Sequence, residues 1–220
     1  ANIRAPYSPT PKNSAELSTT ALESGEWQID AADKRYLFDA SGLLAQVSVA
    51  GEQQLLAPFT PDFWRAPTDN DFGNYLTDWG KDWEYASQNR SLERFSVQQL
   101  DDQRVEATAV YAFHSESGDE LGKWHARYTI YANGELNISN RFERATGTAR
   151  LPRIGLQTTL IDGFDQSQWY GRGPHENYRD RNDSAFLDRY QRAIADHYVP
   201  YARPQENGYK TDTRSLRLSG

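Results

Sequence analysis

The segment Tyr128-Thr-Ile-Tyr-Ala-Asn-Gly-Glu-Leu-Asn-Ile-Ser-Asn-Arg-Phe142 carries the strongest local signal for the fold of this chain. Its centre is Asn133-Gly134, a dipeptide that fits a type I′ turn because both residues tolerate positive φ. After the turn, Leu136, Ile138 and Phe142 share one face at the two-residue period of a strand. The segment therefore predicts an antiparallel hairpin with one buried face.

Short strand-like segments separated by turn residues lie on both sides of this hairpin. They are Trp27–Ala31, Arg35–Asp39, Leu43–Ala50, Val97–Leu100, Arg104–Phe113, Trp124–Tyr131 and Arg153–Ile161. Neither a βαβ rhythm nor a glycine-rich phosphate loop interrupts them, so we predict an all-β sandwich or barrel. Helical spacing occurs only in Leu76–Gln88, where Trp79 and Trp83 share a face, Thr77 or Asp78 can cap the start, and Gly80 interrupts the pattern.

The composition of the 220 residues limits the classes of partner. A net charge of −7 argues against nucleic acid or an anionic membrane as a partner, because both need a basic field. No apolar run is long enough to span a bilayer. The absence of Cys rules out disulfides and thiolate metal sites and suits a reducing compartment, so we expect a cytoplasmic protein. The chain also lacks Met, and we expect it to be a piece of a longer protein.

Residues 1–20 are rich in Pro and Ser and predict a linker from a preceding domain, with residues 21–220 forming the β domain. The length fits either one large β domain or two small ones.

Three polar segments combine turn residues with functional groups. The first is Phe63-Trp-Arg-Ala-Pro-Thr-Asp-Asn-Asp71, followed by Gly73. Strand and helix interiors avoid Asp and Asn, and Pro punctuates them, so we expect a loop. Its amide, acid and guanidinium groups suit sugar hydroxyls, and its rings suit the apolar faces of a sugar. The alternative is an Asx-turn in which these side chains bond their own backbone.

The second and third segments, Trp169–Arg181 and Tyr201–Asp212, share an order of residue types: aromatic residues, then Arg, then Pro, then an acid–amide pair. Glu176 and Glu206 can contact a ligand or brace long loops over a sheet, and the sequence leaves both readings open. His175 can act as an acid or base near neutral pH, or it is a packed turn residue.

The residues considered for a substrate pocket are Arg65, Asp69, Asn70, Asp71, Gly73, His175, Glu176, Asn177, Glu206 and Asn207. Asp69-Asn70-Asp71 is loosely similar to a calcium loop, but position 80 is Gly where the bidentate Glu is needed, so we expect no metal site.

Together these segments resemble the C-terminal small-chain domain of glycoside hydrolase family 2 β-galactosidases. The family's motifs are similar to Phe63–Asp71 with Gly73, to Gly171-Arg-Gly-Pro-His-Glu-Asn-Tyr178, and to Arg203-Pro-Gln-Glu-Asn-Gly208 followed by Thr211-Asp-Thr-Arg214. The resemblance runs from about Leu22 to Leu218. It implies a β-supersandwich of the galactose-mutarotase-like type. The family domain continues beyond the last motif, so we expect a truncated domain with an unpaired strand edge.

The resemblance also implies a role beside a separate TIM-barrel catalytic domain of the same polypeptide. In the family, two Glu residues of that barrel perform a retaining hydrolysis of β-galactosides such as lactose. No catalytic residue is therefore assigned to this chain, and the isolated piece is expected to be inactive. We expect one wall of the substrate pocket, no cofactor bound by this chain, Mg²⁺ or Na⁺ only in the parent enzyme, and a homo-oligomeric parent. The alternatives are an autonomous carbohydrate-binding or mutarotase-like domain, with His175 and Glu176 as an acid–base pair, and a purely structural module.

Overall fold

The computed structural model describes residues 16–220, which divide into two compact units. Within the described residues, unit 1 comprises 16–65 and 80–160, and unit 2 comprises 66–79 and 161–220. Antiparallel strands are the main regular secondary structure of both units, which confirms the predicted all-β class. None of the helices found between residues 16 and 220 is long and apolar enough to cross a membrane.

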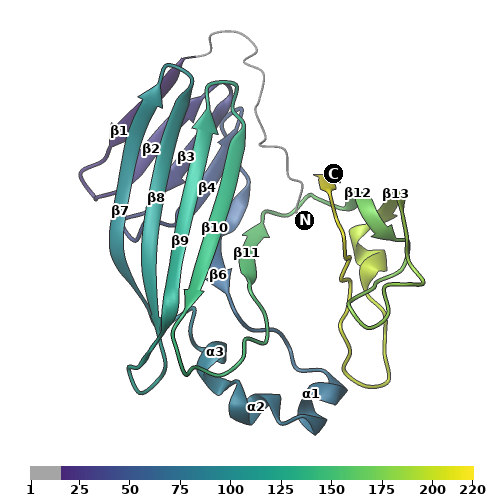
Figure 1. Cartoon of the computed structure of the whole chain (residues 1–220). Coiled ribbons are helices and arrows are strands. Elements are labelled where there is room, and N and C mark those ends of the chain that lie inside the picture. The colour runs from purple at the N-terminus through teal and green to yellow at the C-terminus, as the bar shows by residue number, and fades with distance from the viewer. Residues whose placement is uncertain (1–15) are drawn as a thin grey trace. The chain divides into compact units, whose positions relative to one another are not determined.

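Unit 1 contains two antiparallel meanders that face each other (Figure 1). The first sheet consists of β1 (Leu17–Ala21), β2 (Trp27–Ala31), β3 (Lys34–Phe38), β4 (Leu44–Val49) and β5 (Glu52–Gln53). The second sheet consists of β7 (Arg90–Asp101), β8 (Arg104–His114), β9 (Glu120–Tyr131) and β10 (Leu136–Arg144). The unit is completed by β6 (Leu55–Asp62), its antiparallel partner β11 (Gly155–Leu160), and α3 (Lys81–Glu84).

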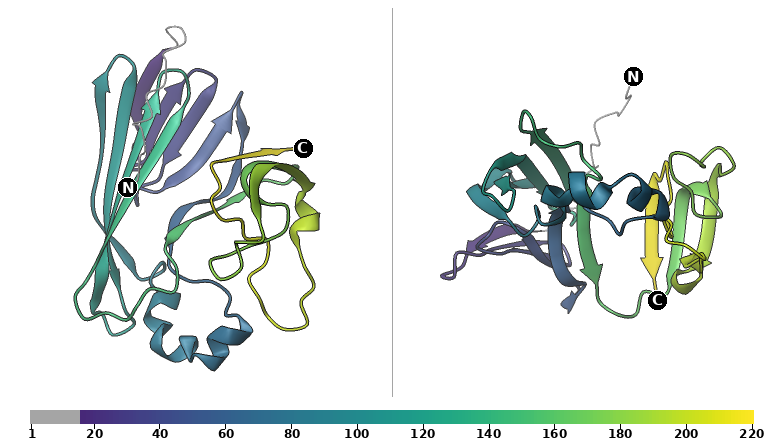
Figure 2. Two further views of the ribbon diagram at one scale, coloured as in Figure 1. Left: turned by 45° about the vertical axis from the view of Figure 1, so that its right-hand side comes forward. Right: turned by 90° about the horizontal axis from the view of Figure 1, so that it is seen from below.

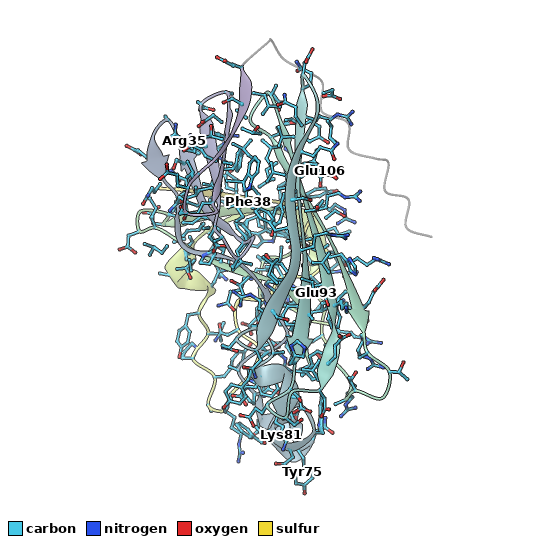
Figure 3. The ribbon with its side chains drawn as sticks, turned by 90° about the vertical axis from the view of Figure 1, so that its left-hand side faces the viewer. Arg35, Phe38, Tyr75, Lys81, Glu93 and Glu106 are labelled. Atoms are coloured by element: carbon cyan, nitrogen blue, oxygen red, sulfur yellow. The ribbon has the colours of Figure 1, made fainter. Side chains whose placement is uncertain are left out.

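The core of unit 1 lies between the two meanders. Alternation places Ile29 and Phe38 on the inner face of the first sheet and Tyr128 on the inner face of the second. The Phe38 and Tyr128 rings meet edge to face at 5.1 Å, and Figure 3 shows Phe38 between the sheets. This is the half-buried period-two pattern that the sequence predicted for the strands.

A second part of this core is a cluster of rings around Phe63, which is fully buried. Its ring centroid lies 5.4 Å from that of Trp83, 4.9 Å from Phe113, 5.9 Å from Trp124 and 4.8 Å from Phe142. The cluster joins the end of β6 to α3 and to the second meander. Tilted and edge-to-face ring pairs stabilise such a cluster beyond the area that they bury.

The predicted hairpin is present, but the predicted turn type is wrong. β9 and β10 pair from Leu136 opposite Ile130 to Arg144 opposite Gly122. Among the turn residues only Gly134 has positive φ (73°), whereas a type I′ turn needs positive φ at Asn133 as well. The amide of Gly134 donates to the carbonyl of Tyr131 at 2.8 Å. The longer loop with one left-handed glycine gives the same register without strain at Asn133.

Unit 2 contains a small antiparallel sheet and several long loops (Figure 2). The sheet has the order β13 (Phe186–Ala193), β12 (Gln166–Gly173), β14 (Ser215–Ser219). The remaining elements of unit 2 are α1 (Asp69–Gly73), α2 (Leu76–Trp79) and the 3₁₀ helix η1 (Ile194–His197).

Two predicted elements differ from the structure. The predicted linker over residues 1–20 lies largely outside the described residues, and residues 17–20 belong to β1. The single helix predicted over Leu76–Gln88 is replaced by α2 and α3, which end and begin on either side of Gly80. Glycine weakens a helix interior because it loses the most backbone entropy on folding, so the chain divides there.

We expect Phe63→Ala to lower the free energy of unfolding of this chain by about 3–5 kcal/mol, because the substitution leaves a cavity among four rings that cannot collapse together. The measurement is chemical denaturation followed by tryptophan fluorescence. Leu56→Ala is the matched control, because Leu56 is 65% exposed and should change stability by less than about 0.5 kcal/mol. Equal effects of the two substitutions would contradict the assigned core.

Candidate functional site

The first polar segment begins α1 with a capping box, so the prediction of a loop is wrong over Asp69–Gly73. The backbone amide and the hydroxyl of Thr68 donate to the Asp71 carboxylate at 2.8 and 2.9 Å, and the Asp71 amide donates to the Thr68 hydroxyl at 3.4 Å. Asp and Asn are disfavoured inside helices but stabilise the first turn, where unpaired amides need acceptors. The Asx-turn alternative comes closest to what is seen, because the Asp71 side chain bonds local backbone.

The part of the first segment that belongs to unit 2, residues 66–71, is bound to the third segment. The Asp69 carboxylate accepts from the Arg203 guanidinium at 2.9 Å, and the Asp69 amide donates to the carbonyl of Pro204 at 2.8 Å. Asn70 is exposed beside this junction. Two rings of the same stretch are also largely exposed: Phe72 at 53% and Tyr75 at 68%.

Glu176 ties the second segment to the third. Its side chain is 4% exposed; one carboxylate oxygen accepts from the Arg181 guanidinium, and the other accepts from the Gly208 amide at 3.1 Å. Arg181 also donates to the Tyr201 hydroxyl at 2.8 Å and lies over the Tyr178 ring at 4.8 Å. A buried carboxylate needs this degree of satisfaction, and the arrangement is the bracing that the sequence left open for Glu176.

Asn177 is fully buried and makes a second bridge between the same segments. Its amide nitrogen donates to the carbonyl of His175 at 3.0 Å. Its oxygen accepts from the Thr211 amide at 3.0 Å and from the Thr211 hydroxyl. The Asn177 backbone amide donates to the carbonyl of Tyr209 at 2.9 Å. One side chain therefore replaces the strand pairing that these loops lack.

Asn207 braces the third segment in the same way. Its side chain donates to the carbonyl of Val199 at 2.7 Å and accepts from the Val199 amide at 3.0 Å. Its neighbour Glu206 is half-buried. His175, by contrast, is exposed, and its ring nitrogen lies 3.2 Å from the Ser184 hydroxyl.

Arg65 and Gly73 are the remaining candidates from the sequence. Arg65 is half-buried and belongs to unit 1, whereas all the others belong to unit 2. Gly73 has a φ that other residues adopt, and a Cβ there would meet no atom within 4 Å, so neither strain nor space requires glycine. In the described range 16–220, no group of three or more acidic, His or Cys side chains is placed to hold a metal ion.

Sequence reasoning missed the arginines as the residues that connect the segments. Besides Arg181 and Arg203, Arg172 donates to Asp212 at 2.6 Å and to the carbonyls of Asn182 and Ala185 at 2.8 and 2.9 Å. The available signal was their position, since each arginine belongs to one of the polar segments. Their partners are distant in sequence, and spacing alone does not identify them.

A basic cluster packs on one face of the unit 2 sheet. The His197 ring lies 5.4 Å from the Trp169 ring and its Nε2 is 2.8 Å from the Ser167 hydroxyl. The Lys210 ammonium lies 5.3 Å from the same Trp169 ring, and its nitrogen has no hydrogen-bond partner among the described residues. Burial lowers the pKa of His197, and the charges of Lys210 and Arg192 lower it further. Burial and the charge of Arg192 likewise lower the pKa of Lys210.

Comparison with known proteins places this geometry in a family. The family model described as the β-galactosidase small chain matches residues 30–220. A β-galactosidase of Priestia megaterium is 36% identical over 160 residues, which cover 73% of this chain and 15% of that protein. A β-galactosidase of Klebsiella pneumoniae strain 342 is 35% identical over 220 residues, which cover 94% of this chain and 21% of that protein. A second Klebsiella pneumoniae β-galactosidase is 37% identical over 202 residues, which cover 86% of this chain and 19% of that protein. The chain thus spans about a fifth of the length of these relatives or less.

We expect Asn177→Ala to destabilise unit 2 by about 2–3 kcal/mol, because it leaves the Thr211 amide and the His175 carbonyl without their partner. Urea unfolding of this chain measures the effect. Asn70→Ala is the control, since its exposed side chain should contribute less than about 0.5 kcal/mol. A small loss at Asn177 would contradict the bridging role.

We expect His197 to make the chain less stable as the pH falls. Its pKa in the folded state is below the ordinary histidine value of 6.5, so the unfolded chain takes up the proton first. This contribution to stability is complete above that value and is lost as the pH falls through the folded pKa. The measurement is the free energy of unfolding at about pH 7.5 and about pH 5.5. The loss on acidification should be smaller in His197→Gln than in the unmodified chain. An undiminished loss in His197→Gln would refute the assignment.

Proposed function

This chain belongs to the β-galactosidase small-chain family, and we propose that it serves a retaining β-galactosidase as a non-catalytic part of the wall of the substrate pocket. The substrates are terminal β-D-galactosyl groups, as in lactose. The reaction itself requires two carboxyl groups about 5–5.5 Å apart, which we assign to a TIM-barrel domain of the same polypeptide. A homo-oligomeric parent enzyme in the cytoplasm, with Mg²⁺ or Na⁺ bound outside this chain, completes the proposal.

One observation carries this proposal: residues 66–71 of the first polar segment gather with the second and third segments in unit 2, although they are far apart in sequence. Asp69 binds Arg203 from a distance of 134 residues along the chain. Glu176 and Asn177 hold Gly208 and Thr211 across 32 and 34 residues. Scattered segments would have no common role, whereas segments held at one place can form a wall with defined geometry.

The braced loops leave suitable groups free for a sugar. Asn70 is exposed and offers both a donor and an acceptor, which the hydroxyls of a sugar need. Phe72 and Tyr75 are exposed on the same stretch and offer apolar surface for the C–H face of a ring. We propose Asp69, Asn70, Asp71 and Gly73 as the part of the wall nearest the substrate. Its support is formed by His175, Glu176 and Asn177 together with Glu206 and Asn207.

The alternative of an autonomous mutarotase-like domain has less support. Such a reaction needs an acid and a base that both reach the anomeric centre. The Glu176 carboxylate is buried and occupied by Arg181 and the Gly208 amide. The His175 ring is exposed, and its hydrogen bond goes to Ser184.

The proposal is tested in the polypeptide that carries this chain together with its catalytic domain. We expect Asn70→Ala to raise KM for a nitrophenyl β-galactoside about 2- to 10-fold, which is the value of one hydrogen bond to a neutral ligand. Asp69→Asn should raise KM as well, because it also loosens the contact with Arg203. Gln98→Ala removes an exposed amide from β7 and is the matched control with unchanged KM.

Two results decide against the proposal. If KM is unchanged in both Asn70→Ala and Asp69→Asn, the chain is a structural module that does not meet the substrate. If this chain alone hydrolyses the galactoside, and Glu176→Gln with Glu206→Gln leaves that activity intact, the assignment of the catalytic groups to another domain is wrong.

A further inference from the structure

The outer face of the second meander of unit 1 contains a hollow of about 330 Å³. Its lining includes Arg94, His125, Arg127 and Arg141, with Val110 and Thr108 between them. We call the hollow lined by these six residues the basic hollow. The hollow lies on the face of the second meander opposite the core. In a chain with a net charge of −7, a concentration of positive charge at one place is unusual.

Strand register explains the shape of the basic hollow. Arg94 on β7 is opposite Val110 on β8, Val110 is opposite His125 on β9, and His125 is opposite Arg141 on β10. Neighbouring strands are about 4.8 Å apart, so the two arginines begin about 14 Å from each other. Long side chains on the outer strands flank short ones on β8, and this difference in length makes a trough.

The next row of the same face supplies hydroxyl groups. It reads Ser96 opposite Thr108, Thr108 opposite Arg127, and Arg127 opposite Ser139. The Ser96 and Thr108 hydroxyls lie 2.9 Å apart. Ser139 and Thr108 both line the hollow. Guanidinium, imidazole and hydroxyl donors therefore point to the same small volume from four strands.

The carboxylates near the basic hollow do not balance its cations. Glu143 is shared, with one oxygen 2.5 Å from Arg141 and the other 3.3 Å from His125. Arg127 has Glu106 at 3.4 Å, and Figure 3 labels Glu106 on this sheet. The Arg94 side chain, which is exposed on β7, makes neither a hydrogen bond nor an ion pair within the described part of the chain. These exposed pairs are weak and can rearrange when a stronger anion arrives.

We propose that the basic hollow binds a compact oxyanion, namely a phosphate or sulfate group, free or carried by a small molecule. Planar guanidinium groups match the oxygens of such an anion with two parallel hydrogen bonds. The hydroxyls of Thr108 and Ser139 can donate to the remaining oxygens. The hollow exceeds the size of one phosphate, so it leaves room for part of the molecule that carries the group. This site is independent of the substrate wall proposed for unit 2, and either proposal can fail alone.

The experiment titrates this chain with inorganic phosphate and with glucose 6-phosphate by calorimetry, against chloride at equal ionic strength. We expect saturable binding to one site that weakens as salt is added, because exposed charges are screened. Tighter binding of glucose 6-phosphate than of phosphate assigns the rest of the hollow to a carried group, and equal binding assigns the site to the free anion.

Variants connect the binding to the basic hollow. Arg94→Gln and Arg141→Gln should each weaken binding about tenfold or more, because each removes a charge-assisted contact. Glu143→Gln should strengthen binding, because it removes the carboxylate that competes for Arg141 and His125. Arg35→Gln is the matched control: it removes one exposed arginine from the other sheet of unit 1 and should leave binding unchanged. Thermal unfolding of each variant checks that it is folded, as is expected for these exposed positions.

Three outcomes overturn the inference. One is the absence of saturable binding of either probe at low salt. Another is an equal loss of affinity in Arg35→Gln and Arg94→Gln, which means that only the net charge of the chain matters. The last is binding of an acidic peptide of six glutamates when neither phosphate nor glucose 6-phosphate binds, which makes the hollow a protein-docking face.

Discussion

The burial of Glu176 and Asn177 is the constraint on which unit 2 depends. The loops of this unit have few strand partners, and backbone groups shielded from water must still find hydrogen bonds. The Glu176 carboxylate accepts a hydrogen bond from the Gly208 amide. The Asn177 side chain accepts one from the Thr211 amide and donates one to the His175 carbonyl. A buried charge without its partner is costly, so the contact with Arg181 stabilises the Glu176 carboxylate.

Unit 1 is stabilised in a different way. Its two meanders exclude water with apolar side chains, and its ring cluster around Phe63 joins strands that are distant in sequence. Such packing tolerates variation on the outer faces, where polar residues need only remain solvated. The same freedom allows arginines to gather over Val110 and form the basic hollow at little cost to the core. The braced loops thus belong to unit 2, and the basic hollow belongs to unit 1.

The sequence predicted the all-β class and the hairpin because periodicity and turn residues act locally. It missed the turn type, since Asn133 accepts either sign of φ and only the whole loop decides. It missed α1 because Asp is disfavoured in helix interiors. Asp69 and Asp71, however, lie in the first turn of α1, where acidic residues are favoured. It identified Glu176 and Asn177 as important but could not choose between a ligand and a brace. That choice depends on Arg181 and Thr211, whose positions follow from the tertiary structure.

Unit 2 is discontinuous, and this has a consequence for the order of events during synthesis. Residues 66–79 leave the ribosome before all of unit 1's second meander, yet their partners lie beyond residue 160. Closing a loop of 134 residues between Asp69 and Arg203 costs considerable entropy unless the intervening chain is already compact. Early folding of residues 80–160 shortens that path. Asp69 therefore lacks its partner Arg203 until most of the chain has been synthesised, and unit 2 completes its folding after unit 1.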